Sequence, residues 1–241
     1  PCFGDLELQN LSFSYEKDKA VLSDINIAFP KGSKTVLIGR NGSGKSTLIS
    51  LLLQLYQPTG GKITLNGIDI SEFVLREYRN MVSVVSQEIY LFNSSIRDNI
   101  CMYKNIDDKF IMEACKDSGL ADFISEVSLD YVVGQNGAML SGGQKQKIAL
   151  ARALVHNSPV IIFDEATSNT DVYSEHQING LLHTKLKEKT VIIITHKQEI
   201  LKEADQIIML KDGAVVGSGV YDDLSKDNLE FKNMLKMGEK Y

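Results

Sequence analysis

The sequence of 241 residues lacks the features of several classes of protein. Its three cysteines, Cys2, Cys101 and Cys115, form no CxxC pair and no metal-binding spacing, which suits a reducing compartment. No apolar run approaches the roughly 18–20 residues of a membrane helix, and no signal peptide is found. The sequence therefore argues against a disulfide-bonded domain, a zinc site and direct membrane insertion.

An excess of positive charge is missing as well. A net charge of -5, from 26 Lys and Arg against 31 Asp and Glu, argues against a nucleic-acid binder. The chain has no repeat and no low-complexity segment, and its length fits one large domain or two small ones. It begins with Pro1 rather than Met, which favours a piece of a longer protein over the loss of an initiator methionine.

The most informative stretch has the spacing of a phosphate-binding loop. It comprises eight consecutive residues: Gly39, Arg40, Asn41, Gly42, Ser43, Gly44, Lys45 and Ser46. A predicted buried strand at 35–38 precedes it, and a predicted buried helix at 47–55 follows. Glycines let backbone amides turn toward anionic oxygens, and the helix N-terminus adds partial positive charge. Lys45 is expected to contact the β- and γ-phosphates and Ser46 to ligate Mg²⁺; the alternative is a glycine-rich turn that carries a lysine by chance.

Two carboxylates follow a second predicted core strand. The apolar run 160–163 indicates a buried parallel strand, and Asp164 and Glu165 come directly after it. Asp164 is suited to bind Mg²⁺ through water, and Glu165 to take a proton from water attacking the γ-phosphate. A structural role for this pair is disfavoured, because burying unpaired charge is costly.

Three further residues lie at or just beyond predicted strands. Gln87 ends the strand at 81–86 and suits Mg²⁺ or the attacking water, although a polar loop residue is the alternative. His196 ends the strand at 190–195 and is placed to donate to the γ-phosphate, or else is a structural or surface histidine. Tyr15 lies on a polar stretch after the strand at 6–13 and either stacks on a base or packs as a strand-end aromatic.

The middle of the chain changes character. Strand patterns vanish between residues 91 and 138, and short amphipathic helices are predicted at 110–115 and 120–124, as in a helical insertion. A second possible anion cradle follows, which comprises Ser141, Gly142, Gly143 and Gln144. It lies at the start of a predicted helix at 145–154, with Ser141 as the N-terminal cap. The alternative is a simple capped helix start.

The remaining predictions concern secondary structure. A strand at 21–27 is expected to pair with the one at 6–13, and a strand at 62–65 precedes a tight turn at Asn66-Gly67. A helix is predicted over 172–186. A hairpin is predicted from 206–210 and 214–218, followed by a polar helical tail.

Together these residues resemble the nucleotide-binding domain of an ABC transporter over nearly the whole chain. Residues 140–144 match that family's signature motif in full, and the phosphate loop, Gln87, residues 160–165 and His196 match its other motifs in the right order. The resemblance implies an α/β fold, a P-loop NTPase core with a parallel sheet. It implies one ABC ATPase domain over 1–241, with core and antiparallel β-subdomain at 1–90 and 157–241, and a helical subdomain at 91–156.

The resemblance also implies a partner and a set of roles. Two copies form a head-to-tail homodimer that sandwiches two ATP molecules, each between the phosphate loop of one copy and the signature motif of the other. In this pattern Tyr15 stacks on the adenine, and residues 39–47, including Thr47, cradle the phosphates. Ser46 and Gln87 contact Mg²⁺, Glu165 polarises the attacking water, and His196 holds the γ-phosphate. Asp171 belongs to the loop that crosses the dimer interface.

Gln87 followed by residues 91–100 is similar to the exporter branch of the family. There a membrane domain of six helices usually precedes the cassette, so the resemblance implies an ATPase at the cytoplasmic face of the membrane, driving export. A soluble ABC ATPase serving translation or DNA repair and the separate ATPase subunit of an importer are the alternatives. Peptide, lipid and drug all stay open as substrates.

Two departures from the exporter pattern occur. Gln135 stands where exporters usually carry a glutamate before the signature motif, which puts the coupling role of that glutamate in doubt. Asn169 and Thr170 replace the usual Ala-Leu in the loop that ends at Asp171, so the apolar packing of its middle is lost. Neither change removes a group that is expected to touch phosphate.

Overall fold

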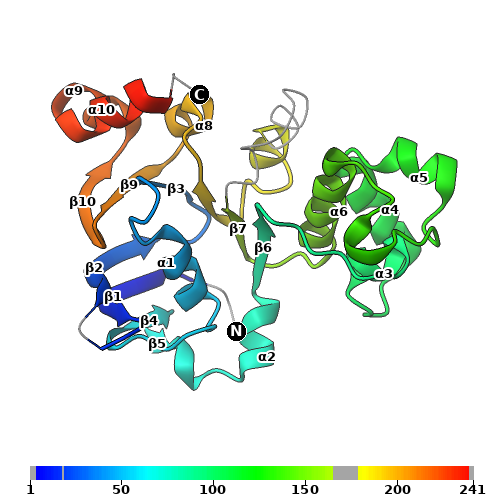
Figure 1. Ribbon diagram of the computed structural model, residues 1–241, viewed down its shortest axis with the longest axis horizontal. Coiled ribbons are helices and arrows are strands. Elements are labelled where there is room, and N and C mark those ends of the chain that lie inside the picture. The colour runs from blue at the N-terminus through cyan, green and yellow to red at the C-terminus, as the bar shows by residue number, and fades with distance from the viewer. Residues whose placement is uncertain (1–3, 18, 165–178, 239–241) are drawn as a thin grey trace. The chain divides into compact units, whose positions relative to one another are not determined.

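The structure, a computed structural model, describes residues 4–17, 19–164 and 179–238. The chain divides into two compact units: residues 1–82 together with 188–241 form the first, and residues 83–187 form the second. The first unit contains an antiparallel sheet and strands paired in parallel, whereas helices dominate the second (Figure 1). The predicted α/β class is confirmed, and the subdomain boundaries at residues 90/91 and 156/157 stay a prediction.

The antiparallel sheet of the first unit has the strand order β2-β1-β4-β5. Its strands are β1 (Leu6–Ser14), β2 (Ala20–Phe29), β4 (Gly60–Leu65) and β5 (Ile68–Asp69). Buried and partly exposed residues alternate along β1, as the sequence predicted, but the pattern slips between Leu8 and Leu11. Asn10 takes φ 50 there, and its side-chain amide donates to Asp24 Oδ1 of β2 at 3.1 Å. The irregularity lets leucines on both sides of Asn10 face the core.

The other strands of the first unit lie in the order β10-β9-β3-β8. They are β3 (Lys34–Ile38), β8 (Thr190–Ile194), β9 (Gln206–Lys211) and β10 (Ala214–Gly219). β3 pairs in parallel with β8 and β9, so Leu37 lies opposite Ile194 on one side and Ile208 on the other. The predicted hairpin is present as β9 and β10. Because parallel strands end at a common edge, the residues that follow β3 and β8 come to the same edge of this sheet.

The helix that follows the phosphate loop is shorter than predicted. α1 spans Lys45–Leu52, whereas the sequence predicted a helix through residue 55. Gln54 takes the left-handed φ 51, and the amide of Leu55 donates to Ser50 O at 2.9 Å, which closes the helix. The Tyr78 hydroxyl, from α2 (Leu75–Asn80), donates to Leu52 O at 2.6 Å and satisfies an end carbonyl. The other helical elements of this unit are η1 (Ile70–Glu72), α8 (Gln198–Lys202), α9 (Tyr221–Asp227) and α10 (Leu229–Gly238).

The second unit combines two neighbouring strands with a helical core. The strands are β6 (Val82–Ser86) and β7 (Val160–Asp164); the helices are α3 (Ile96–Cys101), α4 (Asp108–Asp117), α5 (Ala121–Val127), η2 (Gln135–Gly137) and α6 (Gly142–Val155). The helices predicted at 110–115 and 120–124 are confirmed as α4 and α5. Their apolar faces share one buried core with α3 and α6, which includes Ile100, Ile111 and Ile148. The helix predicted over 172–186 lies largely outside the described residues.

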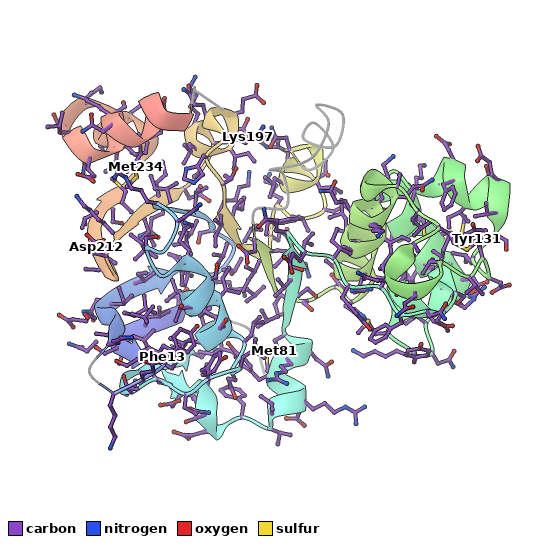
Figure 2. All side chains as sticks on the ribbon, in the orientation of Figure 1. Phe13, Met81, Tyr131, Lys197, Asp212 and Met234 are labelled. Carbon is purple, nitrogen blue, oxygen red and sulfur yellow. The ribbon has the colours of Figure 1, made fainter. Side chains whose placement is uncertain are left out.

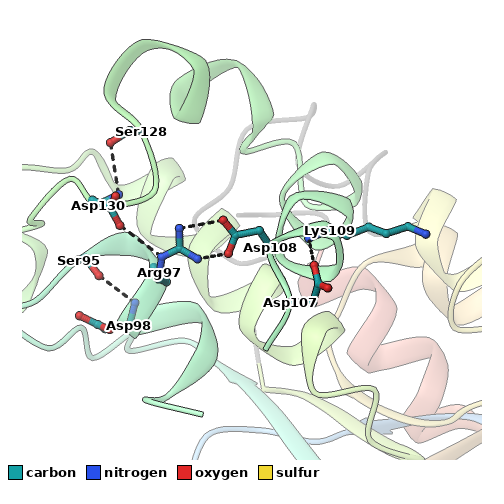
Figure 3. Close-up of polar contacts among 8 residues, drawn as sticks. All are labelled: Ser95, Arg97, Asp98, Asp107, Asp108, Lys109, Ser128 and Asp130. Atoms are coloured by element: carbon teal, nitrogen blue, oxygen red, sulfur yellow. Dashed lines mark hydrogen bonds and ion pairs between the residues drawn. The ribbon is translucent and has the colours of Figure 1, made fainter. Parts of the chain in front are cut away.

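An arginine connects three segments of the helical core (Figure 3). The Arg97 guanidinium, on α3, donates twice to the Asp108 carboxylate at the start of α4, and its Nε donates to Asp130 Oδ1 at 3.3 Å. The hydrogen bond from Arg97 lowers the pKa of Asp108 below its usual value. Such exposed pairs contribute little to the free energy of unfolding, so the arginine mainly fixes how α3 and α4 are arranged.

A histidine at the end of α6 leads to a prediction about how the stability of the fold depends on pH. Burial, with added repulsion from Lys104 and Arg152, lowers the pKa of His156 from 6.5 to about 4. Between those two values the unfolded chain binds a proton that the folded chain does not, so stability falls as pH drops from about 6.5 to about 4. We expect His156→Gln to lose less stability than wild type between pH 7 and pH 5, measured as the urea midpoint of unfolding. His183→Gln, which removes an exposed histidine of the same unit, is the control; equal pH dependence in all three proteins would contradict the prediction.

Candidate nucleotide-binding site

The phosphate loop lies between β3 and α1, as predicted. Its shape depends on glycine: Gly42 and Gly44 take φ 81 and φ 103, and Gly44 caps α1. A Cβ on Gly39 would come within 2.4 Å of Leu210 O, and one on Gly44 within 2.5 Å of the Leu22 side chain. The chain therefore needs glycine here both for backbone conformation and for close packing. Arg40 and Asn41 are exposed in the same loop.

The side chains of the loop fit an anionic ligand. Lys45 is only 6% exposed, and its ammonium donates to Gly39 O at 2.7 Å and to Arg40 O at 3.2 Å, so it lies over the loop. The Ser43 hydroxyl is buried, and no described group forms a hydrogen bond with it. An orphaned buried hydroxyl is costly, and a phosphate oxygen beside Lys45 is the kind of acceptor that both groups need.

A hairpin turn from the far end of the chain supports the loop. Asp212 and Gly213 join β9 to β10 in a two-residue turn with φ 49 and φ 77, and Figure 2 labels Asp212 there. The amide of Gly213 donates to Ser43 O at 3.3 Å, and its carbonyl accepts from the amide of Ser23 at 2.9 Å. Sequence reasoning found the hairpin but not its contact with the phosphate loop, because nothing local relates residues 170 positions apart.

Tyr15 lies beside the phosphate loop within the first unit. Its hydroxyl is 3.2 Å from Thr47 Oγ1 on α1, and the residue is 53% exposed. The structure therefore brings together the predicted base-stacking residue and the predicted phosphate cradle. Two aromatic neighbours of Tyr15, Phe13 and Tyr56, were missed by sequence reasoning. The sequence could have shown Phe13 as a neighbour, because residues two positions apart on a strand lie on the same face. It contains no pattern that relates Tyr56 to Tyr15.

His196 follows β8, the parallel strand next to β3. It is exposed, two residues beyond the end of β8. Leu37 and Ile194 are opposite one another, so His196 and Gly39 both leave the sheet at its C-terminal edge. This shared edge is where open α/β sheets bind their ligands, which agrees with the predicted role of His196.

The predicted signature motif belongs to the second unit. Ser141 caps α6: its hydroxyl accepts from the amide of Gln144 at 3.2 Å, and Gln144 Oε1 accepts from the amide of Ser141 at 2.8 Å. The predicted cap is confirmed and forms a reciprocal capping box. A Cβ on Gly142 or Gly143 would meet nothing within 4 Å, so both backbones are open to an approaching group.

Two predicted Mg²⁺ ligands end the strands of this unit. Gln87 is exposed directly after β6, and Asp164 is the last residue of β7 and partly exposed. Ser46, the third predicted ligand, lies in the first unit and is exposed as well. Hydroxyl, amide and carboxylate oxygens are all ligand types that suit Mg²⁺. Glu165, Asn169, Thr170 and Asp171 lie outside the described residues.

Among the residues that the structure describes, none of the helices has the length and apolar character of a membrane-spanning helix.

The support from the hairpin turn gives a prediction. A Cβ on Gly213 would come within 2.2 Å of Val21 O, which is backbone and cannot yield, so Gly213→Ala should displace the turn and weaken ATP binding. Gly67→Ala is a matched control: Gly67 has the same φ of 77 in the same kind of turn, but a Cβ there meets nothing within 4 Å. The control should cost only the left-handed strain, about 1–2 kcal/mol of unfolding free energy. Titration calorimetry with Mg-ATP tests this, and equal ATP affinity in both variants would contradict it.

Comparisons with known proteins show the family of the chain. Residues 22–168 match the family described as ABC transporter. The ATP-dependent lipid A-core flippase of Escherichia coli (strain K12) is 39% identical over 239 residues, covering 97% of this chain and 41% of that protein. The same flippase of Shigella flexneri gives the same values.

A solved structure is similar as well. The structure of a bacterial Atm1-family ABC exporter with ATP bound superposes with a TM-score of 0.92 at 31% sequence identity, over 98% of this chain and 42% of that one. The chain thus spans less than half the length of these relatives. The family match covers well over half of the chain and includes the phosphate loop, the signature motif and Asp164. The chain belongs to the ABC transporter family, as a nucleotide-binding ATPase domain.

Proposed function

We propose that this chain is the ATP-hydrolysing motor of an exporter, working at the cytoplasmic face of a membrane with a transmembrane domain and a second ATPase domain. The observation that carries the proposal is the phosphate loop, where the buried Lys45 and the orphaned Ser43 hydroxyl meet at the start of α1. The likeness to an ATP-dependent flippase and to an ABC exporter supports the export direction.

Phosphoryl transfer leaves the protein little covalent chemistry, so positioning and charge neutralisation carry most of the catalysis. The loop amides and the Lys45 ammonium bind the β- and γ-phosphates, and the ammonium exchanges its carbonyl contacts at Gly39 and Arg40 for phosphate oxygens. Tyr15 stacks on the adenine, beside Thr47. His196 donates to the γ-phosphate.

Ser46, Gln87 and Asp164 would hold Mg²⁺. When bound, this ion neutralises charge on the phosphate oxygens. Glu165 accepts a proton from the water that attacks the γ-phosphate, which makes it the general base. The residues of the chain thus divide into those that bind phosphate, those that hold the ion, and one that activates water.

The second ATPase domain is a second copy of this chain. Ser141, Gly142, Gly143 and Gln144 of one copy close on the ATP bound by the other, and Asp171 lies at the interface. The open backbones of Gly142 and Gly143 support this role, since a bulky side chain there would keep a phosphate away. ATP therefore joins the two copies, and hydrolysis releases them.

Replacing the lysine of the loop tests the phosphate assignment. Lys45→Ala should abolish measurable hydrolysis and weaken ATP binding, because the charge-assisted contacts to phosphate are lost. Lys62→Ala removes an exposed lysine from β4 of the same unit and is the matched control for charge. Phosphate release and titration calorimetry give the two readouts, and wild-type turnover by the Lys45 variant would reject the phosphate loop.

Replacing the general base tests the dimer mechanism. Glu165→Gln removes the base, which contributes about 10²–10⁴-fold to the rate, and also removes a negative charge near the γ-phosphate. We expect hydrolysis to fall by orders of magnitude while an ATP-bound dimer accumulates. Size exclusion with light scattering in Mg-ATP measures the dimer, and wild type should be mostly monomer.

Glu126→Gln, which neutralises an exposed carboxylate on α5, should behave as wild type in both assays. A Glu165→Gln protein that binds ATP but stays monomeric at high concentration would reject the sandwich. One that hydrolyses ATP at the wild-type rate would move the base elsewhere, with His196 as the next candidate.

A further inference from the structure

The ring of Tyr15 is restrained by contacts from three different segments. The Phe13 ring lies 4.8 Å away, centroid to centroid, at 87°, and the Tyr56 ring lies 5.2 Å away at 88°. The Tyr15 hydroxyl is 3.2 Å from Thr47 Oγ1. Tyr15 is nevertheless 53% exposed, so its orientation is fixed while much of its surface stays open to a ligand.

Tyr56 completes a closed triangle of aromatic rings. It is 48% exposed, and its ring centroid is 5.6 Å from that of Phe13, which is buried in the antiparallel sheet (Figure 2). The chain around Tyr56 is itself tied down. On one side the amide of Leu55 donates to Ser50 O, and on the other the amide and hydroxyl of Thr59 both donate to Ser12 O. Tyr56 is therefore a fixed support rather than a mobile neighbour.

A stacking residue binds more tightly when its ring is already oriented. A tyrosine at a strand end that is free to rotate loses conformational entropy when a base stacks on it, which weakens binding. Perpendicular contacts with Phe13 and Tyr56 remove that freedom before the ligand arrives. The Thr47 contact relates the same ring to α1, whose N-terminus forms the phosphate site.

We propose that Tyr56 is a positioning residue for nucleotide binding, acting through Tyr15 by holding its ring in the orientation that stacks on the base. The proposal rests on the proposed role of Tyr15 as the base-stacking residue. Phe13 contributes to the same orientation, but it is a core residue, so its loss would also destabilise the sheet. Among the described residues the Tyr56 hydroxyl forms no hydrogen bond, so the ring and not the hydroxyl carries the effect.

The test separates the base from the phosphates. Titration calorimetry measures the affinity of wild type, Tyr56→Leu and Tyr56→Phe for Mg-ATP and for Mg-tripolyphosphate, which has the phosphates but no base. Tyr56→Leu should bind ATP about three- to tenfold more weakly, the effect of one aromatic pair, with tripolyphosphate affinity unchanged. Tyr56→Phe should match wild type for both ligands, because it keeps the ring.

A double-mutant cycle shows whether Tyr56 acts through Tyr15. In a Tyr15→Ala background, Tyr56→Leu should cause no further loss of ATP affinity. Tyr221→Leu is the matched control, since it removes another perpendicular ring pair of the first unit, with Phe231 at 5.6 Å and 79°. It should leave the affinity for ATP unchanged.

The outcomes distinguish this inference from the proposed function. If wild type binds neither ATP nor tripolyphosphate, the nucleotide site itself is rejected. If wild type binds both and Tyr56→Leu keeps full ATP affinity, only the role of Tyr56 is rejected. A parallel loss of tripolyphosphate affinity, or additive losses in the cycle, would show a general structural role and overturn the proposal.

Discussion

The backbone path from Gly39 to Lys45 is the constraint on which the nucleotide site depends. Gly44 takes φ 103 directly before α1, a backbone conformation that favours glycine, and a Cβ there would come within 2.5 Å of the Leu22 side chain. β2, β9 and the β9–β10 turn all lie against this path. Backbone amides can bind an anion only if the chain keeps one conformation. Because glycine has no side chain to restrict the backbone, the packing around the loop holds that conformation.

The predicted second anion cradle is stabilised in a different way. At the start of α6, the side chains of Ser141 and Gln144 each accept from the other's backbone amide. The first amides of a helix have no acceptor within it, and the capping box supplies acceptors for the amides of Ser141 and Gln144. The helix start is thus held by hydrogen bonds between residues three positions apart.

The aromatic cluster connects the predicted base-stacking residue to the helix that follows the phosphate loop. Tyr15 follows β1 of the antiparallel sheet, and its hydroxyl reaches Thr47 on α1. Phe13 and Tyr56 orient the ring from two sides. The predicted base-stacking residue and the phosphate loop therefore lie in one folded unit, and a shift of α1 relative to β1 would disturb the contact between them. This arrangement explains why a surface tyrosine has so many aromatic neighbours.

The sequence alone determined the phosphate loop, the cap at Ser141, the strands that alternate or run apolar, and the α/β class. Each of these depends on local chemistry: glycine spacing, capping side chains and burial periodicity. The sequence did not predict the end of α1 at Leu52, because a glutamine gives no sign in the sequence that Gln54 adopts a left-handed conformation. Only tertiary structure brought Gly213 under the loop and Tyr56 beside Tyr15. Such contacts join residues far apart in the chain, and no local pattern encodes which distant segments meet.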